Sequence, residues 1–326
     1  MKTGVILVNL GTPQAPTAIA VARFLKEFLS DPRVVETPRW LWWGLLNGVI
    51  LPLRTAKVTR AYRAIWTLQG SPLRVITEAQ TVALERALQR PDAEPAPLVT
   101  FAMTYGGPSV ASRIAELQAA GVEKFLILPL YPQYSATTTG AVYDQVANLI
   151  KASRDIPEIA VVKQYWHHAE YVEALAATVV EHWNRHGRGQ QLLMSFHGLP
   201  ADYVARGDPY RDQCVATANA LAAKLALPAD AWAFGFQSRF GRRQWIRPYA
   251  DDLLREFAHR GVSRVDVICP SFAADCLETR EEINIQSRKL FVAAGGTDFA
   301  LIPCLNASPE HIELLAQIVA RHFALD

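Results

Sequence analysis

The chain has 326 residues, half of them hydrophobic, and carries a net charge of +2 from 33 basic and 31 acidic side chains. A chain of this length can bury two separate cores, so we expect two domains. The near-neutral charge disfavours nucleic acid as the main partner, because proteins that bind nucleic acid present a basic surface.

The N-terminus begins with a short apolar run at residues 5–10. This run is shorter than the apolar region of a secretory signal peptide and is rich in β-branched residues, so it predicts a first strand. No window reaches the about 18 apolar residues that a membrane span needs. The four cysteines form no CxxC pair. We therefore expect reduced thiols and a cytoplasmic protein.

Short β-rich runs then alternate with segments whose apolar residues recur at helical spacing, at residues 82–88, 111–119, 171–183 and 251–259. We predict strands over residues 5–10, 98–103, 125–130, 160–163, 192–196, 231–236, 265–269 and 299–302. This alternation predicts an α/β fold with parallel sheets and right-handed crossovers. Eight strands could form one sheet or two. The chain length favours two lobes that meet near residues 160–170, with a last helix over about residues 309–323.

Polar and aromatic loops follow almost every predicted strand, and ligands of open α/β sheets bind at the carboxyl ends of the strands. His197 directly follows the strand at residues 192–196, and it is the only one of the eight histidines at such a strand end. An imidazole accepts protons near neutral pH and binds divalent metals. A histidine that caps a helix or lies in the core is the alternative interpretation.

Three carboxylates follow the strand at residues 265–269. We expect a helix from about residue 274, on which spacings of three and four place Asp275, Glu278 and Glu282 on one face. A solvated acidic face is the alternative, but the row begins at a strand end. A histidine beside carboxylates suits metallation of a porphyrin, which needs proton acceptors and ligands that release a divalent cation. A zinc hydrolase usually has a close motif such as HExxH, and the sequence contains none.

An aromatic and aliphatic stretch at residues 40–53 contains Trp40, Trp42 and Trp43 and is flanked by basic residues. A buried helix and turn would explain it. The other interpretation is an apolar lip that receives a large flat ligand, whose carboxylates the basic flank could pair with, and that contacts a membrane surface.

Taken together, these segments resemble the ferrochelatase family from residue 4 to about residue 306. The matching motifs are VNLGTP, DPRVVE, WLWW with LRTAK, QGSPL, LPLYPQYSATTTG, SFHGLP, FQSRFG and CPSFAADCLET. Their order and spacing over nearly the whole chain make the resemblance specific.

The resemblance implies two Rossmann-like lobes, each a four-stranded parallel sheet flanked by helices. The lobes would span residues 1–163 and 164–305, with a C-terminal helix at 306–326 that packs back on the first. The implied reaction inserts Fe²⁺ into protoporphyrin IX and releases two protons, the last step of haem biosynthesis. Fe²⁺ would be a substrate, with no organic cofactor and no [2Fe–2S] cluster. The protein would be a monomer or homodimer, with peripheral membrane contact through residues 40–53.

The resemblance also implies roles for particular residues. His197 corresponds to the family's proposed proton acceptor and metal ligand, and Glu278 to its partner across the macrocycle. Asp275 and Glu282 match acidic residues thought to conduct protons or metal. The implied porphyrin-binding residues are Arg54, Lys57, Tyr62, Tyr105, Tyr131, Ser135 and Trp245.

Two positions depart from the family pattern, since Thr104 stands where many bacterial relatives have arginine and Arg280 where relatives have an apolar residue. Two alternatives stay open. One is a chelatase for another ring or metal, such as coproporphyrin, or cobalt with sirohydrochlorin. The other is a porphyrin or haem carrier without chemistry. The apolar stretch at residues 40–53 favours the less polar protoporphyrin, and His197 with the acidic row favours an enzyme.

Overall fold

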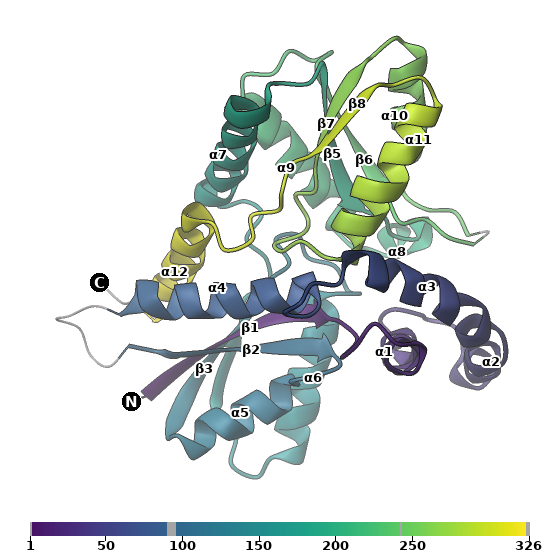
Figure 1. Ribbon diagram of the computed structural model, residues 1–326. Helices are drawn as coiled ribbons and strands as arrows, with labels where there is room; N and C mark the ends of the chain where they lie inside the picture. Colours follow the sequence, from purple (N-terminus) through teal and green to yellow (C-terminus); the bar gives the residue numbers. More distant parts are fainter. Residues whose placement is uncertain (1, 90–95, 242, 324–326) are drawn as a thin grey trace. The chain divides into compact units, whose positions relative to one another are not determined.

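The computed structural model describes residues 2–89, 96–241 and 243–323, which form two compact units (Figure 1). Unit 1 comprises residues 1–131, 135–164 and 315–326, and unit 2 comprises residues 132–134 and 165–314. The last helix, α12 (Pro309–Phe323), therefore contributes its first turns to unit 2 and its remainder to unit 1. Of the C-terminal segment predicted at 306–326, residues 324–326 lie outside the described part of the chain.

Unit 1 is built on a four-stranded parallel sheet with the strand order β2-β1-β3-β4. Its central strand is buried almost throughout, as expected for a strand covered on both faces. The strands are β1 (Lys2–Gly11), β2 (Leu98–Tyr105), β3 (Val122–Pro129) and β4 (Glu158–Val161). The helices are α1 (Ala18–Ser30), α2 (Arg39–Leu45), the π-helix η1 (Leu46–Ile50), α3 (Leu51–Ile65), α4 (Pro72–Leu88), α5 (Val110–Ala119) and α6 (Thr139–Ala152).

Unit 2 repeats this plan with the strand order β6-β5-β7-β8, again all parallel. The strands are β5 (Gln191–His197), β6 (Trp232–Gln237), β7 (Arg264–Ile268) and β8 (Asp298–Leu301). The helices are α7 (Ala169–His186), α8 (Ala201–Ala205), α9 (Tyr210–Lys224), α10 (Ala250–His259), the π-helix η2 (Glu278–Ser287) and α11 (Arg288–Ala293).

The α/β fold with two four-stranded parallel sheets is confirmed, and the single eight-stranded sheet is excluded. Each predicted strand overlaps an observed one. In each sheet all carboxyl ends lie at one edge, because all strands run in the same direction. No helix in the described ranges is both long enough and apolar enough to cross a membrane.

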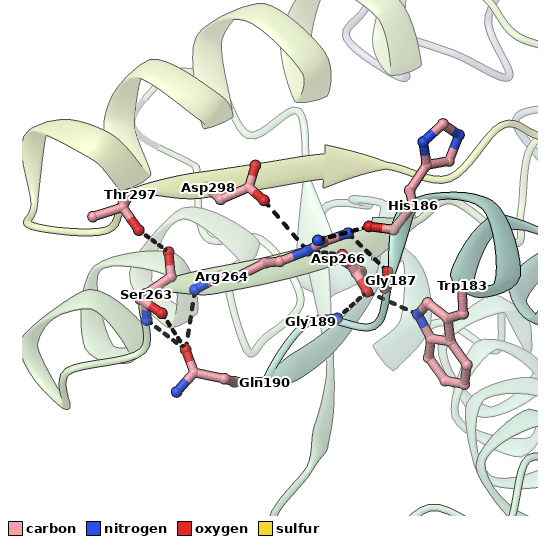
Figure 2. A network of polar contacts seen from close by, with 10 residues as sticks. All are labelled: Trp183, His186, Gly187, Gly189, Gln190, Ser263, Arg264, Asp266, Thr297 and Asp298. Carbon is pink, nitrogen blue, oxygen red and sulfur yellow. Dashed lines mark hydrogen bonds and ion pairs between the residues drawn. The ribbon is translucent and has the colours of Figure 1, made fainter.

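A polar network holds the opposite edge of the unit 2 sheet, where β5 and β7 begin (Figure 2). The fully buried Asp266 of β7 accepts hydrogen bonds from the indole of Trp183, at 2.7 Å, and from the backbone N–H of Gly189, at 2.6 Å. A Cβ atom on Gly189 would lie 2.9 Å from the Asp266 carboxyl carbon, so this approach requires glycine. Arg264 donates to the carbonyls of His186 and Gly187. The end of α7 and the start of β5 are thereby fixed to β7.

We predict that Asp266→Ala lowers the free energy of unfolding by about 3 kcal/mol, because it leaves the buried donors of Trp183 and Gly189 without their acceptor and removes one carboxylate partner of Arg264. Urea unfolding followed by circular dichroism measures this loss. Asp298→Ala is the matched control, since Asp298 pairs with the same Arg264 but is exposed, and it should cost less than about 1 kcal/mol. Equal losses of unfolding free energy in Asp266→Ala and Asp298→Ala would contradict the stabilising role of the buried Asp266.

Candidate active site

His197 is the last residue of β5 and is partly exposed. Its backbone N–H donates to the hydroxyl of Ser271, and its Nδ1 lies 2.7 Å from the carbonyl oxygen of Gly198. A carbonyl only accepts hydrogen bonds, so Nδ1 carries the proton and the lone pair is at Nε2. A Cβ atom on Gly198 would lie 2.5 Å from the carbonyl oxygen of Gln237, so glycine is required for this turn. The imidazole is thus held in one tautomer with a proton-accepting atom.

The neighbouring strand connects His197 to the two glutamates. His197 pairs with Gln237 at the end of β6. The Gln237 side chain donates to the backbone carbonyl of Glu278, at 3.0 Å. The next residue, Ser238, donates from its N–H and its hydroxyl to the two carboxylate oxygens of Glu282, both at 2.6 Å. The carboxyl edge of the sheet therefore carries His197 and, through Gln237 and Ser238, the helix that bears Glu278 and Glu282.

The helix that carries these glutamates differs from the predicted one. It begins at Leu277 instead of about residue 274, and η2 is a π-helix, with i→i+5 hydrogen bonds. Glu278 and Glu282 share this helix, whereas Asp275 precedes it. The prediction that α-helical spacing places all three carboxylates on one helical face was wrong. Tertiary hydrogen bonds place Asp275 instead: one carboxylate oxygen accepts from Thr279, at 2.9 Å, and the other from Asn306, at 2.8 Å.

The electrostatics of Glu282 reflect this arrangement. Burial is the largest influence and raises the pKa of Glu282 above its usual value, and the negative charge of Glu278 raises it further. The hydrogen bonds from Ser238 and the electrostatic influence of the nearby His197 lower this pKa, but they do not outweigh burial. A carboxyl group with a raised pKa holds a proton closer to neutral pH, so Glu282 is suited to receiving and passing on protons.

Trp245 lies beside the His197 turn. Its indole N–H donates to the carbonyl of Phe240, at 3.0 Å, and the side chain is only 7% exposed. A Cβ atom on Gly198 would lie 3.2 Å from the indole ring. The structure thus places the predicted Trp245 next to the catalytic candidate, packed against the turn that holds it.

The other predicted residues belong to unit 1. Tyr105 ends β2 and donates its hydroxyl to Asp31, at 2.8 Å; burial, and then the Asp31 carboxylate, raise the pKa of Tyr105. Burial also raises the pKa of Tyr131, which follows β3. The hydroxyl of the buried Ser135 lies 3.0 Å from that of Thr137. These three residues share the carboxyl edge of the unit 1 sheet.

Arg54, Lys57 and Tyr62 lie on α3. Lys57 is exposed, and burial lowers the pKa of the partly buried Arg54. Tyr62 is buried and packs edge-on against Phe24 and Trp66. The first two side chains can reach a ligand from the surface of the helix, whereas the ring of Tyr62 is part of an aromatic core.

The stretch at residues 40–53 is not a buried helix. No residue of α2 is buried, and Trp40, Trp43 and Leu53 are 81%, 67% and 73% exposed. The indole of Trp42 alone among the three tryptophans turns inward enough to donate to the carbonyl of Leu29, at 2.6 Å. The structure therefore favours an apolar surface here, as the lip interpretation requires.

Sequence reasoning missed the side chains that hold the acids: Gln237, Ser238 and Asn306. Gln237 and Ser238 belong to the FQSRFG motif, from which only the nearby Trp245 was predicted as a site residue. Asn306 follows the last strand, and this position could have indicated it as a candidate site residue. Among the described residues, no three or more His, Cys, Asp or Glu side chains are arranged to hold a metal ion, so the metal prediction rests on His197 and Glu278 as a pair.

Two four-stranded parallel sheets flanked by helices define the fold class, and the second sheet carries His197 at its carboxyl edge. Solved chelatases share the fold. SirB from Bacillus subtilis with Fe³⁺ superposes with a TM-score of 0.57 at 12% identity, covering 100% of this chain and 96% of that one. CbiX, the terminal enzyme of sirohaem biosynthesis in denitrifying bacteria, gives a TM-score of 0.52 at 15% identity, covering 99% and 100%.

Sequence comparison identifies the family. The ferrochelatase family model matches residues 2–323. A ferrochelatase of Aeromonas hydrophila is 50% identical over 323 residues, 99% of each chain. Ferrochelatase 1 of Shewanella oneidensis is also 50% identical, over 97% of this chain and 94% of that protein. The chain belongs to the ferrochelatase family, and the resemblance of its motifs is confirmed.

The buried His311 of α12 gives a prediction for the pH dependence of stability. Burial lowers the pKa of His311 to about 4, whereas an unfolded histidine titrates near 6.5. As the pH falls, the imidazole of this histidine is therefore protonated in the unfolded chain at a higher pH than in the folded protein. The stabilisation is therefore complete above about pH 6.5 and falls by roughly 3 kcal/mol toward pH 4. Urea unfolding of the wild type and His311→Asn at pH 7, 5.5 and 4.5 checks this. Parallel pH profiles for the two proteins would show that His311 does not titrate in this way.

Proposed function

We propose that this chain inserts Fe²⁺ into protoporphyrin IX with His197 and Glu278 as the groups that act at the centre of the ring. The observation that carries the proposal is the set of hydrogen bonds from Gln237 and Ser238, which attach the helix of Glu278 and Glu282 to the end of β6, the strand that pairs with His197 at the end of β5. In the reaction, one Fe²⁺ replaces two pyrrole N–H protons, and both protons leave the ring without any change in the oxidation state of iron.

The proposed roles follow from the chemistry of the side chains. The Nε2 lone pair of His197 accepts a pyrrole proton and can bind the metal, because neutral imidazole does both. The carboxylate of Glu278 is its partner at the ring. Imidazole and carboxylate suit Fe²⁺ and, lacking thiolates, are less prone to trap softer cations. Glu282 and Asp275 extend the row away from the ring as a path for protons or metal.

We propose porphyrin-contact residues for each unit by itself. Trp245 supports the His197 turn in unit 2. Arg54 and Lys57 provide positive charge for the propionate carboxylates, and Tyr105, Tyr131 and Ser135 complete the proposed contacts, whereas the buried Tyr62 supports α3. The reaction as proposed needs no organic cofactor and no [2Fe–2S] cluster, because acid–base groups and transient metal ligands are sufficient for it.

We predict that His197→Ala and Glu278→Ala each lower the rate of insertion at least about 100-fold, because each removes a proton acceptor or metal ligand at the ring. Protoporphyrin binding, measured by fluorescence quenching, should change little. Anaerobic incubation with Fe²⁺, or Zn²⁺ as a surrogate, and loss of the free-base absorption bands measure the rate.

Matched controls are His259→Ala, at the exposed end of α10, and Glu281→Ala, whose carboxylate accepts from Gln286. Both should keep normal rates. Full activity of His197→Ala and Glu278→Ala would refute the site. If the wild type binds porphyrin without inserting metal, the protein is a carrier. If it inserts metal into coproporphyrin alone, coproporphyrin and not protoporphyrin is its substrate.

We further propose that the apolar surface formed by Trp40, Trp43 and Leu53, with Arg39 and Lys57 beside it, contacts membrane lipid peripherally. Exposed tryptophans next to basic side chains are typical of interfacial binding to anionic lipid.

We predict that Trp40→Ser/Trp43→Ser floats with liposomes of phosphatidylcholine and phosphatidylglycerol several-fold less than the wild type, because the apolar contact is lost. Leu68→Ser is the matched control, since Leu68 is a fully exposed apolar residue of unit 1 outside this surface. Absence of wild-type flotation at both low and high salt would exclude the proposal.

A further inference from the structure

We propose that Asn306, itself held by His311, is a positioning residue that fixes Asp275 at the start of the acidic row. This inference rests on the proposed function, because the importance of Asp275 does. Neither Asn306 nor His311 is among the site residues predicted from the sequence, and neither is expected to touch a substrate.

Asn306 binds the segment before η2 at three points. Its backbone N–H donates to the carbonyl of Ala273, at 3.0 Å. Its side-chain oxygen accepts from the backbone N–H of Asp275, and its side-chain nitrogen donates to a carboxylate oxygen of Asp275, both at 2.8 Å. The amide thus fixes the main chain and the carboxylate of Asp275 together, and Asp275 is only 4% exposed.

The conformation of Asn306 is costly and is held in place from the other side. Its φ angle of +48° lies in the left-handed region, which is unfavourable for most residues but tolerated by asparagine. The fully buried His311 lies with Nδ1 2.6 Å from the carbonyl oxygen of Asn306, so Nδ1 donates to it. The His311 backbone N–H in turn donates to the hydroxyl of Ser308. A strained residue persists where its surroundings fix it in this way, often next to a functional site.

An amide suits this position better than a charged group. It supplies a donor for the carboxylate and an acceptor for the N–H, and it adds no charge that would cancel or repel that of Asp275. Arg280 lies 3.9 Å from the same carboxylate oxygen and is 42% exposed at its side chain. Asn306 donates to this same oxygen at 2.8 Å, so the shorter contact of the oxygen is the one with Asn306.

The test compares variants that differ only in these bonds. Asn306→Gly keeps the left-handed backbone accessible and removes the amide, while Asn306→Asp keeps its shape but faces Asp275 with a second carboxylate. We expect the apparent KM for Fe²⁺ to rise about tenfold, with the KM for porphyrin changed less than about twofold, because residues that orient metal-handling groups act on the metal. Ala226→Gly is the matched control, since Ala226 has a similar φ of +49° in a distant turn, and both KM values should stay normal.

His311 variants separate positioning from general stability. The side-chain nitrogen of asparagine can take the place of Nδ1, whereas that of glutamine takes the place of Nε2. His311→Asn should therefore keep a near-normal KM for Fe²⁺, and His311→Gln should raise it as Asn306→Gly does. Asn306→Gly combined with Asp275→Asn should be no worse than Asp275→Asn alone, because both changes remove the same effect.

The outcomes are distinct. A wild type without insertion activity refutes the proposed function, and with it this inference. An active wild type whose KM for Fe²⁺ is unchanged in Asn306→Gly refutes the inference alone. A purely structural role of Asn306 would give a different result. Both KM values and kcat would then worsen to the same extent, and the effect would be the same in the two His311 variants. It would also follow the fall in melting temperature. Additive effects in the double variant would also overturn the proposal.

Discussion

The hydrogen bonds from Ser238 to Glu282 are the constraint on which the rest of the site depends. Ser238 follows β6 directly, in a left-handed conformation with φ of +67°, and it binds both carboxylate oxygens. Because β6 pairs with β5 in the register that places Gln237 opposite His197, the strands set the separation of imidazole and carboxylate. A shift of one residue in this register would move Ser238 out of reach of Glu282.

This constraint has an electrostatic consequence. Glu278 and Glu282 are one helical turn apart, so their charges repel, and burial adds to the cost of a second anion. The Ser238 bonds and the nearby His197 favour the charged form of Glu282, but burial and the charge of Glu278 still raise its pKa. When neighbouring carboxylates are held together and their negative charge is not fully neutralised by the protein, they favour the uptake of a proton or a cation. That property is the one that metal insertion requires.

Local patterns made most of the fold predictable. The strands were recognisable because buried parallel strands are continuous apolar runs, and His197 because it ends one. The spacing of Glu278 and Glu282 also indicated a shared helix. The helix type and the place of Asp275 could not be predicted, because a π-helix has the composition of an α-helix and Asp275 is fixed by Asn306, 31 residues away in the chain. Such contacts depend on tertiary packing and leave no periodic signal.

The two ends of the strands in the unit 2 sheet differ: residues at one end stabilise the fold, and residues at the other form the candidate site. At the start of β5 and β7, the buried Asp266 satisfies several donors, and the glycine beside it allows close packing. At the carboxyl edge of the same sheet, His197 at the end of β5 is partly exposed, and Ser238 after β6 and Asn306 after β8 hold left-handed conformations that cost energy. Because one strand connects the two edges, the well-bonded edge can stabilise the fold while the other keeps its strained residues. The arrangement explains how buried carboxylates can stay close together at the edge where the strands end.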